Sequence, residues 1–312
     1  MEHVAHWDDA PTRRREAGHI AATWSDLGAA SRSVRVGLQR IRIEPGRWST
    51  PAHVEGAEEE IFYVLGGSGL SWQDGETYEV GPGDCFVHLA QEQAHTLRAG
   101  PDGLEVLAFG QRVPHGNTFL PRSGVGWMWP GFVEAIAITK ADHPFMREAA
   151  VGEPEVGEPA QRPGRIVNVT DVEPAAWGRG NRVRAERRNL GRAAGSVFTG
   201  LQHSTVAPGK WGQVPHCHSA EEELFVVLDG EGIVLLGEDE HPVGRGTVVA
   251  RPAGTGVAHA FRAGADGLTV LAYGTREPDD VCYYPRSNKL SFRGVGVIAR
   301  LERLDYWEGE EE

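Results

Sequence analysis

Short apolar runs separated by turn residues dominate the pattern of hydrophobic and polar positions along the chain. Residues 61–65 (IFYVL) and 224–228 (LFVVL) are apolar runs of five bounded by Glu and Gly, which is typical of buried strands rather than helices. Residues 45–46 and 208–209 are both Pro-Gly and predict type II turns, because Pro sets φ at the first central position and Gly supplies the positive φ at the second. Many short strands at regular spacing predict an antiparallel sandwich or barrel.

The same sequence pattern occurs twice along the chain. Residues 33–67 align without gaps with residues 196–230, and 17 of these 35 positions are identical. An offset of 163, which becomes 164 after one inserted residue, carries other parts of the first half onto the second. Between the copies lies a segment rich in Pro, Gly and Glu that has no amphipathic period. We therefore predict two all-β domains in tandem, residues 1–147 and 165–312, joined by a linker at 148–164.

Histidine and glutamate side chains stand where strands of the second half are expected to begin. His216 and His218 are two residues apart on a strand and so point to one face; Glu223 opens the next apolar run, and His259 precedes a later one. Three imidazoles and one carboxylate favour Fe, Mn, Ni or Zn over Ca or Mg. The run of three glutamates that contains Glu223 is expected to be a solvated strand entrance. Glu222 is the fallback ligand, because the four-residue loop between His218 and Glu223 can rotate by one position.

These spacings resemble the two motifs of the cupin superfamily. Residues 209–230 match the first motif (Gly, His-x-His, Glu, Gly), and residues 246–259 match the second (Gly, Pro-x-Gly, His), although that His comes two residues late and the usual following Asn is missing. The resemblance implies that each half is a double-stranded β-helix, or jelly-roll, barrel and that the chain is a bicupin. Segments 252–261, 280–289 and 304–310 also resemble small, poorly characterised cytosolic cupin proteins, which adds little about a substrate.

The first half departs from the cupin motif at one ligand position, where Glu55 replaces the second histidine. The other three ligand positions are kept as His53, Glu60 and His95. Two histidines and two carboxylates can still hold a divalent cation. Without a cation, two close carboxylates repel and one is expected to hold a proton at raised pKa; with a cation, the site should prefer harder ions such as Mn(II). We predict that the second half carries the principal site.

Composition and charge restrict the class of partner. The chain has 31 basic and 44 acidic residues, a net charge of −13, which disfavours nucleic acid and anionic membrane surfaces. Three cysteines suit a reducing cytoplasm, and Cys85 and Cys282 have no partner in the sequence. No secretory signal is visible, and no apolar run approaches the ~20 residues that span a bilayer. We expect a cytoplasmic protein, and exposed barrel edges are compatible with a homo-oligomer.

The sequence therefore predicts divalent-metal binding in the second half, with a small molecule as ligand or substrate. The cupin resemblance allows dioxygenase, decarboxylase or isomerase chemistry on a small oxygen-rich molecule, and the sequence leaves open whether the site is catalytic. The alternative is a bicupin that binds a sugar-like or carboxylate-like molecule without catalysis. A storage-type scaffold is disfavoured because it needs no metal ligands, and a helix-turn-helix regulator because no basic helical segment precedes either half. No catalytic residue is assigned.

Overall fold

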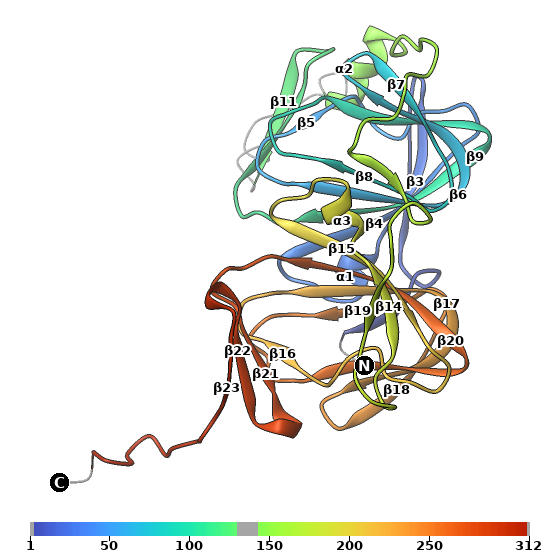
Figure 1. Cartoon of the computed structure of the whole chain (residues 1–312). Coiled ribbons are helices and arrows are strands. Elements are labelled where there is room, and N and C mark those ends of the chain that lie inside the picture. The colour runs from blue at the N-terminus through green and yellow to red at the C-terminus, as the bar shows by residue number, and fades with distance from the viewer. Residues whose placement is uncertain (1–2, 130–142, 311–312) are drawn as a thin grey trace.

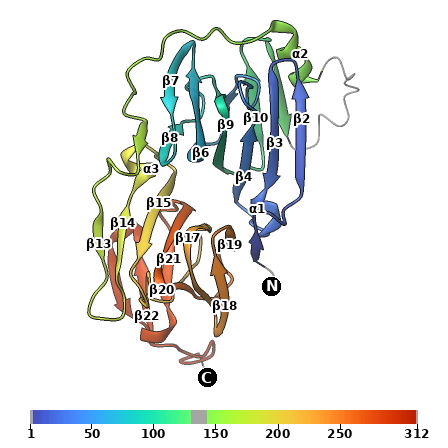
Figure 2. The ribbon, with the colours of Figure 1, turned by 90° about the vertical axis from the view of Figure 1, so that its right-hand side faces the viewer.

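A computed structural model describes residues 3–129 and 143–310 of the chain. The strands form two similar halves stacked one on the other (Figure 1). In each half, a large antiparallel sheet is accompanied by a smaller one among the described residues. The chain passes from one half to the other along one side of the molecule (Figure 2). The predicted all-β, tandem architecture is confirmed.

The first half is built on a large sheet whose strand order is β12-β8-β6-β9-β4-β3-β2, with β7 paired to β6. Its smaller sheet has the order β11-β10-β5. The bounds of these strands are β2 (Thr12–Ala17), β3 (Ile20–Asp26), β4 (Val36–Ile43), β5 (Val54–Glu55), β6 (Glu60–Gln73), β7 (Glu76–Val80), β8 (Asp84–His88), β9 (His95–Gln111), β10 (Gly116–Leu120), β11 (Val125–Trp129) and β12 (Ile166–Asn168).

The second half repeats this plan with a large sheet of order β1-β19-β17-β20-β15-β14-β13, with β18 paired to β17, and a smaller sheet of order β16-β21-β22-β23. Its strands are β1 (Val4–His6), β13 (Ala175–Trp177), β14 (Ala185–Arg188), β15 (Thr199–Val206), β16 (Cys217–His218), β17 (Glu223–Leu236), β18 (Asp239–Gly244), β19 (Thr247–Arg251), β20 (His259–Thr275), β21 (Val281–Tyr284), β22 (Lys289–Phe292) and β23 (Val297–Arg300). The described helices are short: α1 (Leu27–Ala30), α2 (Pro144–Val151), α3 (Leu190–Ala193), η3 (Pro285–Ser287) and η4 (Arg293–Val295). No described helix has the length and apolarity to cross a membrane.

One strand from each side of the linker pairs with the opposite half. Strand β1, close to the N-terminus, pairs antiparallel with β19, with Val4 opposite Val249, and the N-terminus accordingly lies against the second half (Figure 1). Strand β12, just after the linker, pairs with β8, with Ile166 opposite Phe86. The boundary at 148–164 stays a prediction, and these two pairings tie the halves together across it.

A continuous apolar core fills the interface between the halves. Phe109 of β9 and Tyr273 of β20 occupy equivalent positions in the repeat, and their ring centroids are 5.0 Å apart. Ile61 and Leu224, also equivalent, are fully buried in the same cluster. The apolar runs predicted as buried strands therefore supply the core that joins the halves, and burial of this kind stabilises the folded state by roughly 25 cal/mol per Å² of apolar surface.

The middle glutamate of each Glu-Glu-Glu run crosses this interface. Glu222 accepts hydrogen bonds from the backbone N–H groups of Val34 (2.8 Å) and Arg35 in the first half. Its counterpart Glu59 accepts them from the backbone of residues 197–199 in the second half. Both side chains are fully buried. The expectation of a solvated strand entrance is therefore wrong for this position, because each carboxylate caps backbone donors of the other half.

The closing glycine of the first cupin motif is needed for a close approach of two backbones. Gly230 has φ +78°, and a Cβ at this position would collide with the carbonyl oxygen of Gly267. The equivalent Gly67 has φ +74° and lies in the same way against Gly103. A side chain here would be strained by its backbone conformation and would also push β17 or β6 away from its neighbour.

Candidate metal centres

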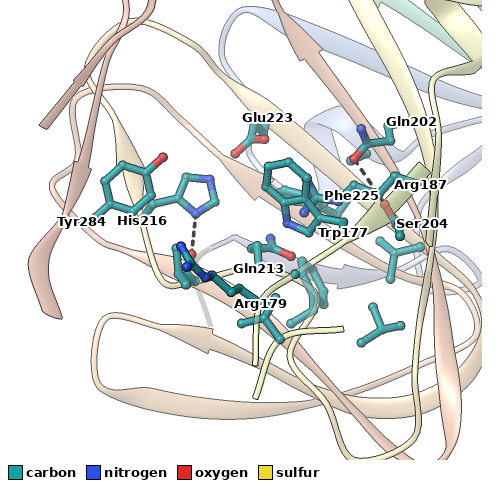
Figure 3. Close-up of a pocket in the computed structure, with 18 residues that line it drawn as sticks. Trp177, Arg179, Arg187, Gln202, Ser204, Gln213, His216, Glu223, Phe225 and Tyr284 are labelled. Carbon is teal, nitrogen blue, oxygen red and sulfur yellow. Dashed lines mark hydrogen bonds between the residues drawn. The ribbon is translucent and has the colours of Figure 1, made fainter. Parts of the chain in front are cut away.

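The structure brings the four predicted ligands of the second half together. His216 directly precedes β16, His218 ends that strand, Glu223 begins β17 and His259 begins β20. Two backbone hydrogen bonds, from His216 N–H to His259 O (3.3 Å) and from His259 N–H to His216 O (2.8 Å), hold these segments side by side. In Figure 3, His216 and Glu223 both border one cavity.

The donor atoms of this cluster converge without satisfying one another. Glu223 Oε2 lies 2.9 Å from His259 Nε2 and 3.3 Å from His218 Nε2. These three atoms are buried, yet the geometry of their contacts leaves each without a hydrogen-bond partner. His216 completes the group, since ligand atoms of His216, Glu223 and His259 lie within 4.8 Å of one another. Buried polar atoms are normally paired, so this set suits a cation with nitrogen and oxygen ligands.

The outer ring nitrogens of two histidines are occupied. His216 Nδ1 donates to the carbonyl oxygen of Val214 (2.8 Å). His218 Nδ1 donates to Asp280 Oδ2 (2.7 Å). Each bond leaves Nε2 as the ring nitrogen that faces the cluster, the arrangement that orients histidine ligands in metal sites.

Burial and mutual contacts shift the pKa values of all four side chains in this cluster. Burial lowers the pKa of His216 to about 3, and burial also lowers the pKa of His259. Burial would raise the pKa of Glu223, but His259 and His218 hold it well below its usual range. Burial would lower the pKa of His218, but its hydrogen bond to Asp280 and the negative charge of Glu223 raise it to about 10. A metal entering this site therefore displaces a proton from His218.

Two residues beside the cluster were not found by the sequence reasoning. Asp280 is buried and, besides holding His218, accepts hydrogen bonds from the backbone N–H groups of Ala220 (3.0 Å) and Glu221 (3.1 Å). Cys282 pairs with His218 across β21 and β16, and its Sγ lies within 4.8 Å of ligand atoms of His216 and His218. Burial raises the pKa of this thiol to about 12. Both residues fall inside segment 280–289, which resembles small cupin proteins in sequence, but no spacing rule links them to His218.

The first half gathers its four candidates in a different way. His95 Nε2 donates to Glu60 Oε2 over 2.9 Å, and His53 Nε2 lies 3.7 Å from the same oxygen. Glu55 lies 3.6 Å from His53 Nε2 and accepts hydrogen bonds from Thr118 (3.0 Å). His53, Glu60 and His95 form a group with the compactness of a metal site, and Glu55 stands beside it.

Three carboxyl groups crowd this first site. Burial, followed by the charge of Glu60, raises the pKa of Glu55 to about 7. The same two causes raise the pKa of a third carboxyl, Glu58, to about 9. The raised pKa in the Glu55–Glu60 pair falls on Glu55, with burial as the larger cause. The ring of His88 stacks on His95 at a centroid distance of 3.8 Å.

A cavity of about 480 Å³ opens onto the second cluster (Figure 3). His216, Glu223 and Tyr284 border it on one side, and Phe225 forms part of its wall. A second cavity, of about 490 Å³, reaches His53 and Glu55 in the first half. Both clusters are thus accessible to a small molecule.

Comparisons with known proteins agree with this architecture. The family described as Cupin domain matches residues 39–109 and 202–272. A mutant of the Bacillus subtilis oxalate decarboxylase superposes with a TM-score of 0.60 and 16% identity, over 89% of this chain and 78% of that chain. A structure of the same enzyme described by its Mn(II) centres gives 0.58 and 17% over the same shares of the two chains. A third, determined at pH 4.6, gives 0.58 and 16%, over 88% and 78%.

No curated protein matches the chain in sequence. At such low identity, the likeness to oxalate decarboxylase shows the fold and leaves the activity open. The cupin match falls once in each half, on the strands that carry the His and Glu residues of both clusters. The chain therefore belongs to the cupin superfamily, as a bicupin with two cupin domains in tandem.

Proposed function

We propose that the second cupin domain binds one divalent transition metal through His216, His218, Glu223 and His259, and uses it to act on a small oxygen-rich molecule. The observation that carries this proposal is the convergence of buried, unpartnered atoms of His218, Glu223 and His259 at the end of a cavity. A bound divalent ion there would supply Lewis acidity toward oxygen atoms of a substrate. Manganese is the first ion to test, because a bicupin of the same fold is described by its Mn(II) centres; Fe, Ni and Zn are the others.

Tyr284 is the hydrogen-bond donor that we propose beside this site. Its ring stacks on His216 at a centroid distance of 5.9 Å, and the residue borders the cavity. Burial raises the pKa of its hydroxyl above the usual range, so the group keeps its proton at neutral pH. It can therefore donate a hydrogen bond to a molecule held against His216.

For the first domain we propose a weaker site that prefers harder ions, formed by His53, Glu55, Glu60 and His95. Support comes from the extra carboxylate and from the hydrogen bond that already joins His95 to Glu60. An ion must break this bond and displace the proton that Glu55 or Glu58 holds near neutral pH. The second site, which offers three imidazoles and where Glu223 and His259 form no such hydrogen bond, should load first.

Metal analysis of the purified protein tests the main proposal. We expect close to one equivalent of a transition metal, loss of that metal in the double variant His216→Ala and His259→Ala, and a folded protein after chelation, since the core does not depend on an ion. For a catalytic site, azide should change the visible spectrum of the Co(II)-substituted protein, because an open coordination position is required. Full metal retention in the double variant contradicts the ligand assignment, and an unresponsive Co(II) spectrum favours binding without catalysis.

The cytoplasmic location, the absence of nucleic-acid and membrane partners, and assembly into a homo-oligomer remain predictions from the sequence.

A further inference from the structure

The cavity of the second domain combines polar side chains with apolar walls that a metal site for a very small polar molecule does not require. Its inner walls are formed by side chains of the large sheet, among them Val206, Phe225, Phe261 and Val270. At the mouth stands Trp177, whose side chain is 50% exposed. Exposed aromatic side chains at the edge of an apolar cavity are typical of ligand-binding surfaces. A two-carbon diacid would leave most of these walls in contact with water.

One cation in this cavity has no carboxylate in direct contact, although the charge of Glu223 acts on it from a distance. Arg187 of β14 lines the cavity, and its guanidinium carbon lies 4.0 Å from the ring centroid of Trp177. One of its nitrogens donates to the carbonyl oxygen of Gly212 (3.0 Å), but its Nε is buried without a partner. Among residues 3–129 and 143–310, no carboxylate forms an ion pair with it. Burying an unpaired charge is unfavourable, so the position favours an anionic ligand.

Arg187 stays charged in spite of its surroundings. Burial lowers its pKa to about 10, which is still well above neutral pH. In Figure 3, Arg187 lies on the side of the cavity opposite His216 and Tyr284, with Trp177 between them in this view. An anion held by Arg187 would therefore extend across the apolar walls toward the metal ligands.

We propose that the second domain binds an aromatic carboxylate, with the carboxylate on Arg187, the ring against Trp177 and Phe225, and the far edge toward His216 and Glu223. Carboxylate recognition by a guanidinium is charge-assisted and directional, and ring contacts add to simple burial of apolar area. The assignment deepens the proposed function, on which it rests for the role of the metal. Capture of the carboxylate by Arg187 does not itself require the metal.

Calorimetric titration of the full chain with benzoate, benzamide and oxalate tests this assignment. Benzoate should bind more tightly than benzamide, which lacks the charge, and more tightly than oxalate, which lacks the ring. Arg187→Gln should weaken benzoate binding by about 10- to 100-fold, the usual effect of losing hydrogen bonds to a charged group. The benzoate affinity of Arg187→Lys should fall between those of the wild type and Arg187→Gln, because Lys keeps the charge but lacks the planar guanidinium.

Arg179→Gln is the matched control, because Arg179 lines the same cavity but is exposed. It should change benzoate affinity by no more than about threefold, as expected for an exposed charge. If benzamide or oxalate binds as tightly as benzoate, or if folded Arg187→Gln keeps the wild-type affinity, the assignment is wrong. Should Arg187→Gln fail to fold, the three wild-type titrations and Arg187→Lys still decide it.

The same titrations separate this inference from the proposed function. They are made with protein loaded with metal and with protein stripped by a chelator. Arg187-dependent benzoate binding in a protein that never acquires metal would remove the proposed function and keep the aromatic-carboxylate site. Metal binding without Arg187-dependent benzoate binding would keep the proposed function and remove the aromatic-carboxylate site.

Discussion

The two domains share one strand framework and differ most in the small sheet beside each candidate metal site. In the second domain, His218 of β16 is held by Asp280, and β21 adds Cys282 and Tyr284. At the repeat offset of 164, the corresponding positions of the first domain carry Gly116, Thr118 and Leu120. The first domain thus lacks the carboxylate that orients the histidine and the hydroxyl at the cavity wall.

Paired positions across this small sheet differ together. Glu55 and Thr118 are opposite each other in β5 and β10, and Thr118 donates a hydrogen bond to Glu55. Their counterparts His218 and Cys282 are opposite each other in β16 and β21. A ligand position and its cross-strand neighbour therefore form one unit. Where the ligand differs between the domains, the residue opposite it differs as well.

The cavities of the two domains also differ in the residues that line them. Each contains a stacked Arg–Trp pair, but the pair is Arg15 and Trp24 in the first domain and Arg187 and Trp177 in the second, with the two residue types on exchanged strands. In the first domain, Phe145 of α2 also lines the cavity. In the second domain, the corresponding part of the chain lies at its C-terminal end, which extends away from the domain (Figure 1).

Exchanging the distinctive ligands should produce the largest effect on this comparison. Glu55→His should raise tightly bound metal from about one to about two equivalents per chain, because it restores three imidazoles and one carboxylate. His218→Glu should weaken the second site by on the order of 100-fold or more, beyond what loss of an orienting partner costs. Elemental analysis and competition with a chelator measure both. Two equal sites in the wild type would contradict the asymmetry.

Removing the carboxylates at the interface should destabilise the chain unequally. Glu59→Ala leaves three backbone N–H groups and the hydroxyl of Thr199 without an acceptor, which should cost about 3–6 kcal/mol. Glu222→Ala leaves two N–H groups and should cost about 2–4 kcal/mol. Urea unfolding measures both, with the exposed Glu231→Ala as the control. Equal effects of all three variants would refute the role given to these carboxylates.

The support of His218 should matter for metal affinity more than for the fold. Asp280→Asn keeps the size of the side chain but removes the charge that orients His218, and should weaken metal binding about 10- to 100-fold. Asp279→Asn, at the exposed neighbouring position, should leave affinity unchanged. Chelator competition gives both values, and an unaltered affinity in Asp280→Asn would show that His218 is positioned by its strand alone.

The crowded carboxyls of the first domain should give a smaller, pH-dependent effect. The folded state raises the pKa of Glu58 to about 9, so it binds this proton more tightly than the unfolded chain does. Stability from this group is present at low pH and is lost as pH rises toward 9. Glu58→Gln should therefore stabilise the metal-free protein against urea at pH 8 and have little effect at pH 4, whereas the exposed Glu79→Gln should be neutral at both. A stabilisation independent of pH would contradict the buried-proton explanation.

The amino-acid sequence alone was enough to predict the duplication, the all-β fold and the grouping of four candidate ligands in each half. These depend on local periodicity: alternation places His216 and His218 on one face, and the same strand pattern recurs at a fixed offset. Such signals survive because neighbouring residues in a strand have a fixed geometric relation whatever the rest of the chain does.

Contacts between residues far apart in the chain were decided only by the tertiary structure. Asp280 reaches His218 across 62 positions, and Val34 donates to Glu222 across 188, which turned an expected fallback ligand into an interface residue. The surroundings of Arg187 in the folded domain leave its Nε buried without a hydrogen-bond partner. These relations depend on strand register and on the stacking of the two halves, and neither is encoded in the spacing of nearby residues.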